Sequence, residues 1–161
     1  MLARYTIYPM QLPALALLAA TLTVSSLATA AEDTPEHKGR VVVTDTTCEI
    51  LGPINFAVND AHLTKQHRKL IHAVAQTLLG NPSITLMEIE GFADRGETNP
   101  DKLGLARATS VMLALEVEGV PAYRMQVGSL GATQPLDKSP RASAQAKNRR
   151  IEFLIIHRES I

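Results

Sequence analysis

Residues 83–118, SITLMEIEGFADRGETNPDKLGLARATSVMLALEVE, form the stretch that decides the fold. Its opening part, residues 83–91, is apolar on both faces, which is typical of a strand at the centre of a sheet. Residues 100–118 predict a helix, because Asn99 can cap it and Pro100 suits its first turn. A strand joined to a helix by a short turn predicts helices packed on a sheet.

Further elements are predicted on either side of this unit. Thr64 can cap a helix that ends at Gly80, and alternation of apolar residues indicates strands. The predicted strands are Val41–Val43, Ile54–Val58, Arg124–Leu130 and Arg150–His157, with a helical turn at Ala142–Lys147 inside the loop 131–148. One core should bury the side chains of Leu70, Val74, Ile89, Val111, Leu115, Ile151 and Phe153.

Length and composition limit the classes of function. The chain has 161 residues, of which 45% are hydrophobic and 20% charged, which suits one packed domain with a tail. Sixteen basic residues balance sixteen acidic ones, and aromatic residues make up only 4%. A neutral chain with few aromatic side chains is poorly equipped for nucleic acid, so we expect no nucleic-acid partner.

The N-terminal residues 1–30 are predicted to be a cleaved signal peptide. Arg4 provides a positive start, residues 12–22 an apolar centre, and Ala28–Ala30 the small-x-small form of a cleavage site. An uncleaved membrane anchor is the alternative, because the uncharged stretch is long enough to span a bilayer. Pro13 and the Ser/Thr-rich second half argue against an anchor.

Residues 31–45 are predicted to form a linker, because their first part is polar and contains a Pro and a Gly. The folded domain is expected over residues 46–161. Cys48 is the only cysteine, so the chain has no internal disulfide. Its distance from the apolar segment argues against lipidation. We interpret it as a small half-buried residue at the domain edge, with an intermolecular disulfide as the alternative.

Three histidines, His62, His67 and His72, lie on or beside the first predicted helix. Their spacing of five residues does not place them one turn apart, and no Cys or acid completes a ligand shell. Packed or solvated histidines are the preferred interpretation, so neither a metal nor any other cofactor is expected.

Arg107 borders the apolar face of the second predicted helix. None of its neighbours at three or four residues is a carboxylate, so its charge has no partner on its own helix. A partly buried charge without a partner is costly. We expect a partner from elsewhere, with Asp94 the nearest candidate and a ligand carboxylate another. The alternative is an arginine that extends to water.

The ordered set of motifs resembles the family of OmpA-like C-terminal domains over about residues 48–157. The motifs are Ile54-Asn55-Phe56, Ile89-Glu90-Gly91-Phe92-Ala93-Asp94, Leu103-x-x-x-Arg107-Ala108-x-x-Val111, Gly119-Val120-Pro121-Ala122-x-Arg124, Gly128-x-x-Gly131-x-x-x-Pro135 and Asn148-Arg149-Arg150-Ile151-Glu152-Phe153. The resemblance implies an α+β fold, an OmpA-like βαβαβ(α)β sandwich with helices packed on a mixed sheet.

The resemblance also implies a ligand site. In the family a strand-end Asp and a helix Arg bind the diaminopimelate of wall peptides, and these positions match Asp94 and Arg107. The charges fit, because a carboxylate can hold the ligand ammonium and a guanidinium can take a carboxylate through two parallel bonds. Secondary candidates are Asn99, Arg149, Phe56 and Asn59.

The chain departs from the family pattern around this site. The turn after Asp94 is about two residues shorter, Pro100 stands at a usual Asn, Gly104 at a usual Ser, and Phe92 at a usual His. The expected function is non-catalytic, non-covalent binding of peptidoglycan in the periplasm of a Gram-negative bacterium, in association with its outer membrane or cell wall. Other envelope proteins are candidate further partners.

Two other classes of function stay open. The first alternative is a structural or interaction domain of an envelope complex that does not bind the wall, which the short turn and Pro100 favour. An enzyme is the third hypothesis, and it is disfavoured because the local sequence contains no recognisable Ser-His-Asp or Cys-His arrangement.

Overall fold

The computed structural model describes residues 41–44, 48–50 and 53–159. The predicted signal peptide, residues 1–30, lies outside this part of the chain, and so does the side chain of Cys48. Within the described part, no helix combines the length and the apolar character needed to cross a membrane.

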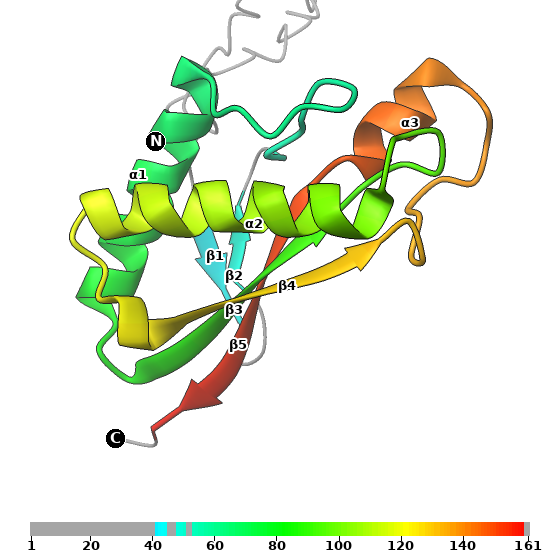
Figure 1. Ribbon diagram of the computed structural model, residues 1–161. Coiled ribbons are helices and arrows are strands. Elements are labelled where there is room, and N and C mark those ends of the chain that lie inside the picture. Colours follow the sequence, from blue (N-terminus) through cyan, green and yellow to red (C-terminus); the bar gives the residue numbers. More distant parts are fainter. Residues whose placement is uncertain (1–40, 45–47, 51–52, 160–161) are drawn as a thin grey trace, which may run out of the picture. The chain divides into compact units, whose positions relative to one another are not determined.

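A mixed three-stranded sheet forms the centre of the fold, and its strand order is β4-β3-β5 (Figure 1). The middle strand, β3 (Ile84–Phe92), runs parallel to β4 (Met125–Gly131) and antiparallel to β5 (Ile151–Arg158). The predictions of an α+β fold and of a central strand at residues 83–91 are therefore confirmed. Because β3 lies between β4 and β5, the segment that follows Phe92 begins at the end of the central strand, between the ends of its two neighbours.

In the described residues three α-helices accompany the sheet: α1 (Lys65–Gly80), α2 (Pro100–Val117) and α3 (Ala142–Asn148). Helix α1 begins with a capping box, in which the Thr64 side chain accepts the N–H of His67 and the His67 ring accepts the N–H of Thr64. His67 is thus a packed residue that closes the helix start, as predicted for a structural histidine.

Helix α2 lies across β3 and β4, and its first half approaches the sheet very closely (Figure 1). A Cβ atom added at Gly91 would collide with the backbone of Gly104, and one added at Gly104 would collide with the Ser129 hydroxyl. That hydroxyl donates to the carbonyl of Asp101 at 2.9 Å. The absence of a side chain at Gly104 therefore allows direct contact of the helix with the strand end.

One hydrophobic core joins the helices to the sheet. All the residues predicted to be buried together belong to it, which confirms that prediction and the assigned register of the last strand. These are Leu70, Val74, Ile89, Val111, Leu115, Ile151 and Phe153.

The N-terminal strands differ partly from the prediction. Val41–Val43 is β1 as expected, and it pairs antiparallel with β2 (Cys48–Ile50) in a separate two-stranded sheet. The predicted strand Ile54–Val58 is wrong, since only Asn55 forms an isolated bridge, to Arg150. The alternation there reflects a loop that buries Ile54 and Phe56 and exposes Val58, without a partner strand along its length.

Candidate functional site

The candidate site lies where β3 ends and the chain turns towards α2. Asp94 lies two residues after the last residue of the strand, and it is only 7% exposed. Its carboxylate accepts the Gly96 N–H on Oδ1 at 3.0 Å and the Asn148 Nδ2 on Oδ2 at 3.1 Å. Asn148, the last residue of α3, also donates to the carbonyl of Asp137 and accepts its N–H. One amide therefore joins Asp94 to the loop that precedes α3.

A small cavity opens beside Asp94. It has a volume of about 150 Å³, and its lining includes Asp94, Asp137, Lys138 and Arg95. Asp94 and Asp137 supply carboxylates, whereas Lys138 and Arg95 are exposed cations. The size suits one side-chain head group, and the carboxylates suit a positively charged one.

Asp94 remains ionised at neutral pH in this setting. Partial burial by itself raises the pKa of Asp94. The hydrogen bonds from Asn148 and from the Gly96 N–H, together with the charge of Arg149, outweigh burial and lower the pKa below its usual value. Asp94 therefore offers a fixed negative charge to the cavity.

Arg107, on α2, is completely buried, with 0% of its side chain exposed. Its guanidinium forms an ion pair with Glu97, through Nη2 to Oε1 at 2.7 Å and Nη1 to Oε2 at 2.9 Å. The remaining donors bind the backbone carbonyls of Asp60, Ala57 and Phe92. All five N–H donors of the guanidinium are thus used.

These contacts correct the prediction for Arg107. The expectation of a partner off its own helix is confirmed, but that partner is Glu97 and not Asp94. An arginine extending to water is also wrong. Glu97 reaches Arg107 because the short turn after Asp94 folds back on itself, with the Glu97 N–H bonded to the Asp94 carbonyl. The sequence contained one usable signal, which is a second acid, Glu97, in the turn between Asp94 and the helix that carries Arg107.

Asn59 supports the turn from the other side. It adopts a left-handed backbone with φ of 53°, where Asn is tolerated better than most residues. Its N–H donates to Glu97 Oε1 at 2.7 Å, and its side chain accepts the N–H of Thr98. Asn59 therefore holds both Glu97 and the segment leading into α2.

Phe56 packs against the Arg107 guanidinium, and Arg149 in turn contacts Phe56. The Phe56 ring lies 5.1 Å from the Arg107 guanidinium carbon, and Phe56 is buried. The Phe56 carbonyl accepts Arg149 Nε at 2.8 Å. Asn99, by contrast, occupies the cap position of α2 without a capping side-chain bond, so its predicted capping role is wrong. Its backbone is left-handed, with φ of 50°, whereas capping side chains act from an extended backbone.

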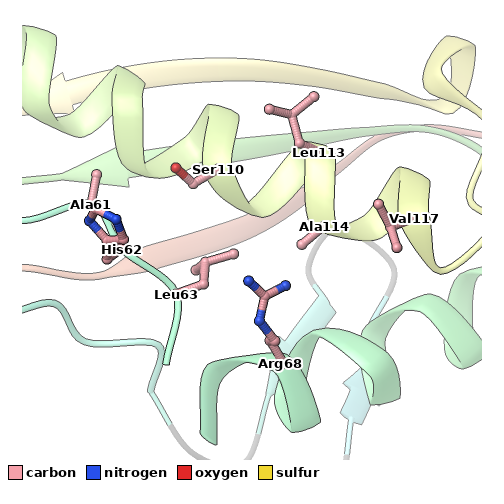
Figure 2. Close-up of a pocket in the computed structure, with 8 residues that line it drawn as sticks. All are labelled: Ala61, His62, Leu63, Arg68, Ser110, Leu113, Ala114 and Val117. Carbon is pink, nitrogen blue, oxygen red and sulfur yellow. The ribbon is translucent and has the colours of Figure 1, made fainter. Parts of the chain in front are cut away.

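A second, larger cavity of about 410 Å³ lies between α2 and the residues that lead into α1 (Figure 2). Leu63, Leu113 and Val117 give it an apolar lining, and Arg68 points into it. It brings together no set of converging polar groups comparable to the one around Asp94. The strand-end cavity is therefore the better candidate for a specific ligand site.

The domain is similar in sequence to a known protein family. Residues 55–149 match the model of the OmpA family. The probable lipoprotein YiaD of Escherichia coli (strain K12) is 30% identical over 104 residues, covering 63% of this chain and 47% of that protein. The chain thus spans about half the length of this curated relative.

Solved structures share the fold. The peptidoglycan-associated lipoprotein from Burkholderia pseudomallei matches with a TM-score of 0.59 and 28% identity, over 63% of this chain and 87% of that one. The cell wall anchor of the T6SS from Pseudomonas aeruginosa matches with a TM-score of 0.62 and 22% identity, over 74% of this chain and 87% of that one. The latter similarity shows a common fold.

Proposed function

The chain belongs to the OmpA family, and from this premise we propose that its domain binds peptidoglycan without catalysis, through the diaminopimelate of stem peptides. Similarity to a peptidoglycan-associated lipoprotein supports the wall as the partner and the cell envelope as the location. The binding is non-covalent, since the proposed contact is an ion pair between a side-chain carboxylate and a ligand ammonium.

The observation that carries the proposal is the state of Asp94. Its carboxylate is ionised, faces a small cavity and accepts two hydrogen bonds from the protein, from Gly96 and Asn148. A carboxylate offers about four acceptor positions, so capacity remains for an ammonium group. Because Asn148 and Gly96 already hold the carboxylate, little side-chain freedom is lost when a ligand binds.

In this proposal Asp94 contacts the ligand, whereas Arg107 has a positioning role. A ligand carboxylate reaches its guanidinium only after Glu97 leaves it. As it stands, Arg107 holds the strand end through the Phe92 carbonyl, and it holds the turn through Glu97. We place Arg107 and Asp94 in one site, with Arg107 acting on the position of Asp94.

Calorimetric titration with a stem tripeptide that ends in diaminopimelate tests this function. Asp94→Asn should weaken binding about tenfold or more, because a charge-assisted bond is lost. Asp60→Asn is the matched control, since the Asp60 carboxylate lies against the exposed His62, while its backbone carbonyl to Arg107 is retained. Equal affinity of all three folded proteins would remove Asp94 from the site.

A structural or interaction module without wall binding is the second candidate function. The saturation of Arg107 by Glu97 favours it, because the guanidinium is then a part of the folded framework. In that case the folded wild-type chain should show no heat of binding with the tripeptide and no retention on purified peptidoglycan. Retention that Asp94→Asn abolishes would contradict this candidate.

A further inference from the structure

The Glu97 carboxylate uses its full hydrogen-bonding capacity inside the domain. Oε1 accepts the Asn59 N–H and Arg107 Nη2, each at 2.7 Å, and Oε2 accepts the Asp94 N–H and Arg107 Nη1, each at 2.9 Å. Four bonds match the acceptor capacity of a carboxylate. Only 1% of the side chain is exposed, so Glu97 is a permanent part of the folded site.

A ligand carboxylate would have to compete with Glu97 for Arg107. Displacement would break four hydrogen bonds of Glu97 and would separate a buried ion pair, which is strongly unfavourable. It would also release the Asp94 N–H, and so disturb the residue that receives the ammonium. The internal carboxylate therefore has the advantage over one arriving from solution.

The groups left to a ligand favour a cation. The cavity exposes the carboxylates of Asp94 and Asp137, and the pKa of Asp94 is lowered. Lys138 and Arg95 also line it, but both are solvent-exposed. Exposed ion pairs contribute little, so these cations give weak preference for a ligand carboxylate.

Resting on the proposed wall-binding function, we propose that this site recognises the side-chain ammonium of a stem peptide and not the carboxylate beside it. Glu97 already occupies the guanidinium that would read that carboxylate. Diaminopimelate is lysine with one additional carboxylate on the carbon that bears the side-chain ammonium. The ligand class therefore extends to stem peptides that carry lysine in place of diaminopimelate.

Two tripeptides that differ only in that carboxylate test the inference. Each is titrated calorimetrically into the full-length chain, one ending in diaminopimelate and the other in lysine. The two dissociation constants should agree within about threefold, a difference below ~0.7 kcal/mol. Asp94→Asn should weaken both by about tenfold or more, since both ligands present the same ammonium.

Glu97→Ala provides the complementary test. It frees two N–H donors of Arg107, so the affinity ratio should shift about tenfold or more towards the diaminopimelate peptide. The ratio is insensitive to a loss of affinity that both peptides share. Glu97→Gln is the second variant if thermal melts show that the alanine variant is unfolded. Glu118→Ala, which removes a surface partner of His72, should leave the ratio unchanged.

The outcomes separate this inference from the function it rests on. A preference of the wild-type chain for diaminopimelate by about tenfold or more overturns the inference and leaves wall binding intact. An unchanged ratio in a folded Glu97 variant removes Glu97 as its cause and overturns the inference too. Failure of the folded wild-type chain to bind either peptide overturns both proposals.

Discussion

The two ends of the central strand are each held by an arginine, in different ways. Where β3 begins, Arg124 donates to the Ile84 carbonyl at 2.8 Å and to the carbonyls of Leu78 and Asn81 around the end of α1. Where β3 ends, Arg107 donates to the Phe92 carbonyl at 3.0 Å and pairs with a carboxylate. A different arginine thus binds each end of this strand.

The two arginines bind different partners because they are buried to different extents. Arg124 is half-buried, and backbone carbonyls at a helix C-terminus are sufficient for a cation in that position. Arg107 has no exposed surface, so dipoles alone leave its charge poorly compensated. A buried cation requires a counter-charge, which Glu97 provides. The carboxylate beside Arg107 is therefore needed for the fold, whatever the ligand.

The largest effect is expected from Arg107→Lys. A lysine ammonium has three donors and no planar fork, so it cannot replace five bonds or the paired contact with Glu97. The free energy of unfolding should fall by about 3–5 kcal/mol, measured by urea denaturation. Arg68→Lys, at an exposed position, is the control and should change it little. A loss below about 1 kcal/mol would contradict the structural role given to Arg107.

A smaller loss is expected from Glu97→Gln. The amide keeps the shape of the side chain but removes its charge and places a donor where an N–H now binds. We expect a loss of about 2–3 kcal/mol in the same measurement. Glu118→Gln, which breaks a partly exposed contact with His72, should cost less than about 1 kcal/mol. Equal effects of the two variants would show that Glu97 is not needed to compensate Arg107.

Arg124→Lys should have a weaker effect still. It retains the charge near the end of α1 and loses the branched contact with several carbonyls. The expected loss is about 1–2 kcal/mol by thermal or urea denaturation. If this variant were as damaging as Arg107→Lys, the two ends of β3 would depend equally on their arginines.

The smallest expected effect is the loss of stability that accompanies protonation of Glu97 at acidic pH. Burial alone would raise the pKa of Glu97, but the hydrogen bonds and charge of Arg107 and the N–H groups of Asp94 and Asn59 lower it below its usual value. The unfolded chain therefore binds the proton more tightly. The stability contributed by Glu97 is complete above the unfolded pKa and is lost as the pH falls towards the lower folded value.

Urea denaturation between neutral and acidic pH measures this contribution. The Glu97→Gln variant should lose less stability over that range than the wild-type chain, because it has no carboxylate to titrate at this position. The Arg124→Lys variant should follow the wild-type profile, since its interaction involves carbonyl groups. Parallel profiles of wild type and Glu97→Gln would contradict the lowered pKa.

Most of the fold was predictable because its signals are local and periodic. The apolar run of β3, the Thr64 cap of α1, Pro100 in the first turn of α2 and the alternation in β5 each specify an element without reference to the rest of the chain. The error at Ile54–Val58 has the opposite cause. A loop that covers a core with alternate side chains shows the same pattern as a strand, and only tertiary pairing separates the two.

The candidate site was predictable in part. The position of Asp94 at a strand end and the missing helix partner of Arg107 both follow from the sequence. The partnership with Glu97 does not, because it depends on how the turn after Asp94 folds and on the left-handed backbone of Asn59. A loop's dihedral angles decide which of two nearby acids reaches a buried cation, and residue spacing does not contain them.

The Arg107 contacts also have a consequence for the time course of folding. Two of its hydrogen bonds join groups 47 and 50 residues apart in the chain, to Asp60 and Ala57. Each of these contacts requires the closure of a long loop, and the entropy of closure is lost before the contact contributes any stability. We therefore expect these hydrogen bonds to form after the transition state for folding. Bonds of that kind act mainly on the unfolding rate.

Arg107→Lys should therefore accelerate unfolding far more than it slows refolding, as read from the two limbs of a chevron plot. The buried guanidinium then slows the unfolding of the domain. A long lifetime of the folded state then protects the domain as much as its free energy of unfolding does.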